Sequence, residues 1–274
     1  MFARLANGNV APVRKIEGQK TLLGRTMHAV AYDEVRDEIV VPQEIAQGIL
    51  TFRGGASGEE PPLRRIQGNL TQLHQPDVLA LDAPHGEIYV PQRAPINTVL
   101  VFDNRADGNV APIRILRASA GISFGNSVAV DPVNNVLLVS GSVRVGGSSE
   151  SRLLIYNRTD QGAVAPQRMI GGPKSQYSGG SMVTYSPKGW VVSTSSWGRG
   201  EGGATASLAR YDQYIGVWSI HDNGDIPPRW RLGGPNGTFL QTRNIDLDEK
   251  NRSLIVADKR INSVMTFFFP EMFE

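Results

Sequence analysis

The sequence predicts an all-β fold, a five-bladed β-propeller with four antiparallel strands in each blade. Three observations support this prediction. A segment of the form Gly-Asn-Val-Ala-Pro-x-Arg-x-Ile recurs five times along the 274 residues, apolar runs of strand length recur in the same order between the copies, and no helical periodicity lies between them.

The repeat divides nearly the whole chain into five units. The marker prolines are separated by 50, 50, 54 and 62 residues, and they are Pro12, Pro62, Pro112, Pro166 and Pro228. The units cover about residues 19–68, 69–118, 119–172, 173–234, and 235–274 together with 1–18. Small sheets repeated in this way pack against their neighbours around an axis, so we expect a single domain over residues 1–274.

Each unit contains the signals of four strands. The first apolar run ends in Asp in four units and in Ser in the fourth, at residues 30–33, 79–82, 128–131, 183–186 and 245–248. A turn rich in Asp, Asn, Gly and Pro leads to a second run, which predicts a hairpin, at 38–41, 87–90, 136–139, 190–192 and 254–256. The third run ends near an aromatic residue, at 49–52, 99–102, 153–156, 215–218 and 264–267. The Pro-x-Arg-x-Ile segment supplies the fourth strand.

The two ends of the chain predict how the propeller closes. The last unit has three of the four strand signals and stops near Pro270, while residues 11–17 carry a fourth-strand segment with no preceding strands. We expect residues 11–17 to pair beside residues 264–269 and complete the last blade, because open sheet edges promote aggregation.

Composition excludes several classes of protein. The formal charge is only +2, from 28 Lys and Arg against 26 Asp and Glu, and no basic stripe indicates a nucleic-acid partner. The chain has no cysteine, which excludes disulfides and thiolate chemistry, and its apolar runs are too short to span a membrane. Repeat sequence follows Met1 almost at once, so no signal peptide is expected in this chain, and a cytoplasmic protein and an exported one with its leader removed both remain open.

The runs Val-Ala-Val-Asp, Asn-Asn-Val-Leu-Leu-Val and Leu-Val-Phe-Asp resemble the NHL-repeat class of β-propellers over essentially the whole chain. The longer Pro-x-Arg-x-Ile segment is similar to a repeat of bacterial NHL-like proteins of unassigned function. Many of these proteins are exported, so the resemblance favours an extracytoplasmic location, periplasmic or secreted. Propellers of this wider class include binding platforms, gluconolactonase-like hydrolases and lyases, so the resemblance implies a fold and not one activity.

Polar residues that recur in every unit are expected to belong to the scaffold. Asp33, Asp82, Asp131 and Asp248 each follow a strand, where Asp accepts backbone hydrogen bonds. Arg14, Arg64, Arg114 and Arg168 form a second regular series, which we interpret as ties between strands or blades.

One equivalent position differs in all five units and is the predicted ligand site. The residue five places before the repeated Asp, or before Ser186 in the fourth unit, is in turn His28, Asp77, Asn126, Ser181 and Arg243. In a propeller these strand starts surround one mouth of the central channel, where polar groups bind a metal, an anion or a polar ligand. The alternative is that these residues are polar only because the channel mouth is hydrated.

His28, Asp77 and Asn126 offer a ring nitrogen and oxygen atoms to a divalent metal, Ca²⁺ or Zn²⁺, which loosely resembles the metal cage of gluconolactonase-like propellers. Arg243 departs from that cage, because a fixed cation opposes a metal, although it can hold a substrate carboxylate. No hydrolase elbow, zinc-protease motif or phosphate loop is present, and His74, His85 and His221 fall in turns or linkers.

The leading hypothesis is therefore a non-enzymatic binding or scaffolding propeller for a small polar ligand or a protein, with no cofactor. The alternative is a metal-dependent hydrolase or lyase of gluconolactonase-like type, with His28, Asp77 and Asn126 as ligands and Arg243 orienting an anionic group. Two insertions, residues 141–151 and 193–214, fall in neighbouring units. The second contains Trp197, Tyr211 and Tyr214, and a lid, a partner surface and a long hairpin tip all remain open for it.

Overall fold

The computed structural model describes residues 1–25, 27–197, 212–234 and 237–274. The chain is all-β, with five small antiparallel sheets, one from each repeat, and its helical segments within the described residues are single 3₁₀ turns. This is the five-bladed β-propeller fold that the repeat predicts. The turns are η1 (Gln19–Thr21), η2 (Asn69–Thr71), η3 (Ser186–Lys188) and η4 (Pro270–Met272).

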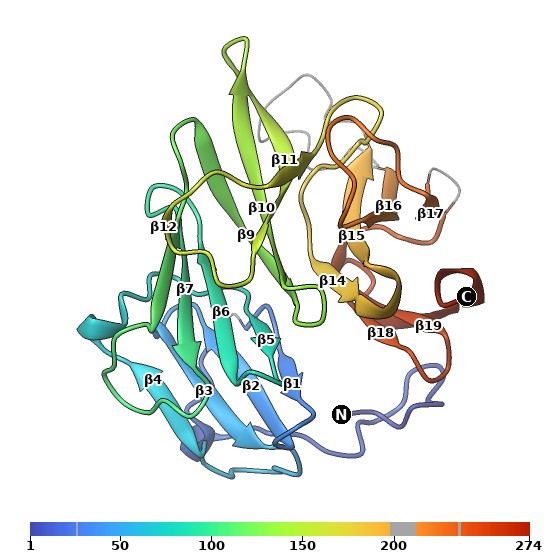
Figure 1. Ribbon diagram of the computed structural model, residues 1–274. Coiled ribbons are helices and arrows are strands. Elements are labelled where there is room, and N and C mark those ends of the chain that lie inside the picture. Colours follow the sequence, from blue (N-terminus) through green and yellow to red (C-terminus); the bar gives the residue numbers. More distant parts are fainter. Residues whose placement is uncertain (26, 198–211, 235–236) are drawn as a thin grey trace. The chain divides into compact units, whose positions relative to one another are not determined.

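The first two sheets follow the predicted strand order. The first contains β1 (Ala31–Asp33), β2 (Glu38–Gln43), β3 (Gly48–Arg53) and β4 (Arg64–Gln67), which lie side by side in this order (Figure 1). The second contains β5 (Ala80–Asp82), β6 (Glu87–Gln92), β7 (Thr98–Asp103) and β8 (Arg114–Arg117), and the short strand β12 (Gly162–Ala163) adds to β8 in parallel.

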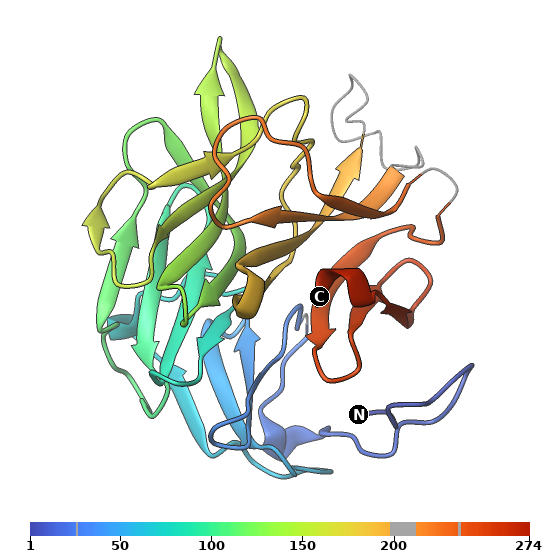
Figure 2. The same cartoon turned by 45° about the vertical axis from the view of Figure 1, so that its right-hand side comes forward.

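The next two sheets also have four antiparallel strands. The third contains β9 (Ile122–Asp131), β10 (Val136–Val145), β11 (Ser148–Asn157) and β13 (Arg168–Ile170). The fourth contains β14 (Met182–Tyr185), β15 (Trp190–Trp197), β16 (Asp212–Ser219) and β17 (Trp230–Gly233). The insertion at residues 141–151 lengthens one hairpin, in which β10 and β11 stay paired as far as Val145 and Ser148 (Figure 2).

The last sheet has three strands, β18 (Thr242–Asp248), β19 (Ser253–Asp258) and β20 (Ser263–Phe268). The predicted fourth strand from residues 11–17 is not among them. Ile16 instead forms a parallel bridge with Gly58, through hydrogen bonds from Glu17 N to Gly58 O (3.0 Å) and from Gly58 N to Lys15 O (2.7 Å). The N-terminal segment is thus held by the first repeat, and its pairing with β20 stays a prediction.

The described chain divides into two compact units. Unit 1 contains residues 1–90 and 100–114, and unit 2 contains residues 91–99 and 115–274. In unit 1, buried apolar residues of β2 and β3, among them Val41, Leu50 and Phe52, form a core cluster. The single domain expected from the sequence stays a prediction.

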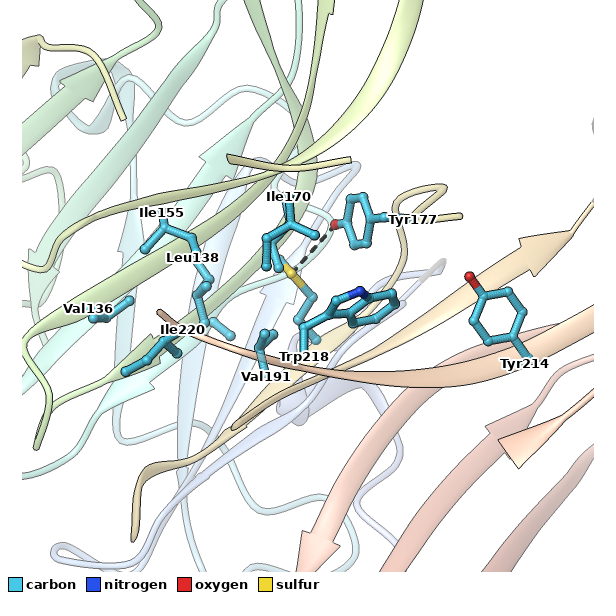
Figure 3. Close-up of a cluster of buried hydrophobic side chains, with 12 residues drawn as sticks. Val136, Leu138, Ile155, Ile170, Tyr177, Val191, Tyr214, Trp218 and Ile220 are labelled. Carbon is cyan, nitrogen blue, oxygen red and sulfur yellow. Dashed lines mark hydrogen bonds between the residues drawn. The ribbon is translucent and has the colours of Figure 1, made fainter. Parts of the chain in front are cut away.

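One core cluster of unit 2 lies between the sheets of the third and fourth repeats. Leu138, Ile155, Val191 and Trp218 come from four strands and pack in one buried cluster (Figure 3). Trp218 meets Tyr177 edge to face, with ring centroids 5.9 Å apart, and the Tyr177 hydroxyl donates to the Met182 sulfur at 3.6 Å (Figure 3). Burial raises the pKa of Tyr177, so its hydroxyl stays protonated in this apolar setting.

Candidate functional site

The repeated Asp residues are part of the scaffold, as predicted. In each of Asp33, Asp82, Asp131 and Asp248, Oδ1 accepts the backbone N–H three residues later, at 3.0–3.1 Å. This hydrogen bond shapes the turn between the first and second strands of the blade. The series is therefore not a carboxylate cluster.

The repeated Arg residues tie strands or repeats together, which also confirms the prediction, and Arg114 does so within its own blade through Glu87. Arg14, Arg64 and Arg168 donate to equivalent carbonyls of the following repeat, those of Gly54 (2.7 Å), Asn104 (3.2 Å) and Ile220 (2.9 Å). The candidates that remain for a functional site are therefore the residues that differ between repeats.

Two of the five predicted site residues meet in unit 1. His28 lies three residues before β1 and Asp77 three residues before β5, and β1 and β5 lie next to each other. Because adjacent strands have adjacent starts, the two loops bring the side chains together. His28 Nδ1 is in direct hydrogen-bond contact with Asp77 Oδ1.

Glu44 joins this pair and was missed by the sequence analysis. It follows β2 directly, and its Oε2 lies 3.6 Å from His28 Nδ1. Ligand atoms of His28, Glu44 and Asp77 all lie within 4.8 Å of one another. The side chains are 29%, 21% and 12% exposed, respectively, so the group is accessible but largely shielded from water. We call these three residues the His28 cluster.

A comparison of the repeats could have found Glu44. The residue that follows the second strand is Glu44 in the first repeat and Arg93 in the second, although the six residues before each are nearly identical, Glu-Ile-Val-Val-Pro-Gln and Glu-Ile-Tyr-Val-Pro-Gln. The strand end is otherwise constant, but its next residue changes from a carboxylate to a guanidinium. His28 and Asp77 vary between equivalent positions of the repeats in the same way.

The other three predicted residues lie in unit 2. Ser181 Oγ donates to the backbone carbonyl of Arg243 and lies 2.8 Å from Asn244 Oδ1, so this pair meets through a backbone group. Asn126 and Arg243 both sit where the pairing register shifts, between Phe124 and Val128 on β9 and between Thr242 and Asn244 on β18. Such bulges redirect a side chain away from the regular alternation of a strand.

The structure therefore brings the predicted residues together in two pairs, His28 with Asp77 and Ser181 with Arg243. A single ring of all five residues, and Asn126 as a metal ligand beside His28, stay predictions from the repeat. The insertion at residues 193–214, for which a lid, a partner surface and a long hairpin tip were all open, falls mainly on residues 198–211, including Tyr211, which lie outside the described residues.

The His28 cluster is electrostatically suited to a cation. It contains two carboxylates and one imidazole, which in its neutral form offers a nitrogen lone pair. Partial burial strengthens the attraction of the two carboxylates for a positive charge, because less water screens them. Within the described residues, these three form a His and carboxylate group whose spacing could hold a metal ion.

Comparisons with known proteins show the fold. No family model and no curated protein matches the sequence. Among solved structures, the chain is similar to hydrazine synthase of Kuenenia stuttgartiensis, with a TM-score of 0.60 and 13% identity, over 90% of this chain and 65% of that one.

Two further structures are similar at the same low identity. A Bacteroides uniformis protein provisionally assigned as a 6-phosphogluconolactonase has a TM-score of 0.52 at 14% identity, over 87% of this chain and 65% of that one. A chain of a nidogen and laminin complex has a TM-score of 0.51 at 13% identity, over 90% and 81% of the two chains.

The chain thus spans about two thirds of the hydrazine synthase chain and of the Bacteroides chain. No helix among the described residues has the length and apolar character needed to cross a membrane. At these identities the likeness concerns the backbone alone, since unrelated activities share one fold. The comparisons therefore show a β-propeller, and the function has to be argued from its residues.

Proposed function

We propose that this chain is a non-enzymatic binding propeller that takes a small, positively charged ligand at the His28 cluster. The observation that supports this is the convergence of His28, Glu44 and Asp77 from three separate segments of unit 1. Two other carboxylates of unit 1 belong to scaffold ion pairs, Glu38 with Arg64 and Glu87 with Arg114. The carboxylates of Glu44 and Asp77 both lie close to the imidazole of His28.

A second candidate is a metal-dependent hydrolase or lyase at the same place. The group formed by His28, Glu44 and Asp77 favours it, because a metal ion held by such ligands would activate a bound water for hydrolysis. The likeness to the Bacteroides protein adds no argument for activity. Arg243 as an anchor for an anionic group, the membership in the NHL-repeat class and the extracytoplasmic location are proposals that rest on the sequence.

Thermal unfolding in the presence of small cations tests the binding proposal. Putrescine, ethanolammonium, guanidinium and Zn²⁺ serve as probes, and at least one should raise the unfolding midpoint of the wild-type protein, because a ligand that binds only the folded state stabilises it. The double variant Glu44→Gln with Asp77→Asn should lose this response.

Glu60→Gln is the matched control, because it removes one carboxylate from the exposed pair with Arg53 in the same unit. It should respond to the probe as the wild-type protein does. A wild-type protein that responds to none of the four probes contradicts the proposal, as does an unchanged response in the double variant. Hydrolysis of δ-gluconolactone that disappears in His28→Ala would favour the enzyme instead.

A further inference from the structure

We infer that His28, Glu44 and Asp77 form a binding site for a divalent transition-metal ion, with Zn²⁺ as the ion of choice. This inference rests on the proposed function, because it names the cation that the His28 cluster takes. It also replaces the ligand set expected from the sequence, in that Glu44 stands where Asn126 was predicted.

The spacing of the three side chains fits one small ion. Zinc binds nitrogen and carboxylate oxygen at about 2.0–2.2 Å, so the ligands of a tetrahedral ion lie roughly 3.4 Å apart. His28 Nδ1 and Glu44 Oε2 are 3.6 Å apart, which is close to that separation. His28 and Asp77 are in direct contact, and a small outward turn of the Asp77 carboxylate would admit the ion between them.

The donor atoms select the kind of metal. Calcium and magnesium take ligand sets made of oxygen alone, whereas an imidazole nitrogen beside two carboxylates suits zinc and its neighbours in the first transition row. The two carboxylates also balance the charge of a divalent ion while the imidazole is neutral. We therefore expect Zn²⁺ to bind in preference to Ca²⁺ and Mg²⁺.

A β-strand and a buried hydrogen bond hold the backbone that carries these ligands in place. Glu44 follows β2 directly, and Gln43, at the end of that strand, accepts the backbone N–H of Gly24 at 2.7 Å through its side-chain oxygen. Gln43 is 3% exposed, so this hydrogen bond fixes the strand end against the loop that leads to His28. Three protein ligands leave a coordination position for water or for an exogenous group, as in zinc sites that bind small molecules.

The experiment uses the full chain after treatment with a chelator and dialysis. Titration with Zn²⁺ in a calorimeter, checked by metal analysis after gel filtration, should give one equivalent per chain. Since loss of a single outer-shell partner weakens metal sites by about 10- to 100-fold, His28→Ala and Glu44→Gln should weaken Zn²⁺ binding by at least about 100-fold. Excess Ca²⁺ or Mg²⁺ should not displace the Zn²⁺.

His85→Ala is the matched control. His85 Nδ1 lies 2.8 Å and 3.0 Å from the two oxygens of Asp82 in the same unit, so it forms a His and Asp pair without the third ligand. This variant should bind Zn²⁺ as the wild-type protein does. Thermal unfolding of each variant shows whether it is folded, and Asp77→Asn provides a second variant if His28→Ala does not fold.

Several outcomes overturn the inference. These are less than one equivalent of Zn²⁺, an unchanged affinity in His28→Ala, and an equal loss in His85→Ala. Stabilisation by putrescine, ethanolammonium or guanidinium without Zn²⁺ binding would overturn the metal site and leave the proposed function standing. Absence of any response to the organic cations and to Zn²⁺ would overturn both.

Discussion

At the scale of single residues, the last residue of the second strand accepts hydrogen bonds from the preceding loop, and it does so as Gln in one blade and as Asp in another. Gln43 and Asp258 both end the second strand of their blades, β2 and β19. Gln43 accepts the backbone N–H of Gly24, and Asp258 Oδ2 accepts those of Leu240 and Gln241 at 2.8 and 2.9 Å. In both blades the strand end holds the loop that precedes the blade.

Asp258 needs stronger compensation for its burial than Gln43 does, because it is a carboxylate and is only 2% exposed. Burial alone would raise its pKa. Hydrogen bonds from the backbone N–H groups of Gln241, Leu240, Arg260 and Ile261 outweigh that effect, so the pKa of Asp258 lies below its ordinary value. A carboxyl whose pKa is lower in the folded than in the unfolded state stabilises the fold above the unfolded pKa, and this contribution is lost as the pH falls through the folded pKa.

Asp258→Asn is therefore expected to lower the free energy of unfolding by about 2–3 kcal/mol near neutral pH, because an amide cannot accept hydrogen bonds at both positions. The difference from wild type should shrink as the pH falls below about 4, where the unfolded carboxyl is protonated. Urea unfolding at several pH values measures both effects. Glu271→Gln, at an exposed carboxylate, is the control, and an equal loss in the two variants would contradict the explanation.

At the scale of elements, the link between successive repeats is a short parallel bridge beside the Arg tie. Ile66 pairs with Gly108 and Ile170 with Gly224, and β8 pairs with β12 at Leu116 and Gly162. Each glycine has a positive φ, between 72° and 85°, which residues with a side chain rarely adopt. The glycine of the repeat motif is thus required by backbone conformation at the place where the next repeat docks.

Arg64 combines this link with a tie inside its own blade. On β4, it reaches Glu38 of β2 with a two-pronged contact, and its Nε donates to the Asn104 carbonyl of the next repeat at 3.2 Å. The two side chains of the ion pair are 19% and 12% exposed, so water screens them little. The pair therefore holds the outer edge of one blade and the start of its link to the next.

Arg64→Met should lower the free energy of unfolding by about 2–3 kcal/mol, because it leaves the Glu38 carboxylate shielded from water without its cation. Arg53→Met, in the exposed pair with Glu60, should cost less than about 1 kcal/mol. Chemical unfolding of the two variants measures both losses in the free energy of unfolding. Equal costs would contradict this explanation, and Glu38→Leu should recover part of the loss in Arg64→Met.

At the scale of the whole molecule, the N-terminal segment behaves as an outer strand toward the first repeat. Arg14 donates to the Gly54 carbonyl as Arg64 does to Asn104, and Ile16 pairs with Gly58 as Ile66 does with Gly108. These contacts support the sequence-based prediction that residues 11–17 serve as the fourth strand of a blade. Among the described strands, β20 pairs with β19 alone.

Deletion of residues 1–18 should therefore lower the thermal unfolding midpoint and promote association, because it removes the outer-strand segment and leaves a sheet edge unprotected. Calorimetry and light scattering measure the two effects. Deletion of residues 1–7 is the control: it removes the hydrogen bonds between Met1 and residues 13 and 14 but spares the repeat motif, so it should cost less than deletion of residues 1–18. A protein without residues 1–18 that stays monomeric and equally heat-stable would rule out closure by this segment.

The sequence by itself determined the fold, the order of strands in each blade, and the scaffold role of the repeated Asp and Arg residues. These features are local or periodic. A turn after a strand, an alternation of apolar residues and a repeated motif each specify their structure within one unit, and the repetition tells which segments are equivalent. The contact of His28 with Asp77 follows from the same logic, since equivalent residues of adjacent repeats start adjacent strands.

Only the tertiary structure decided that Glu44 joins His28 and Asp77, that Asn126 and Arg243 lie at bulges, and that the last sheet has three strands. The physical reason is that these features depend on how loops of different repeats meet in space. A loop side chain can turn toward any of several neighbours. A bulge displaces one residue of a strand, and the pattern of apolar residues in the sequence does not reveal it. The repeat therefore specified the scaffold, while the positions at which its loops converge specified the candidate site.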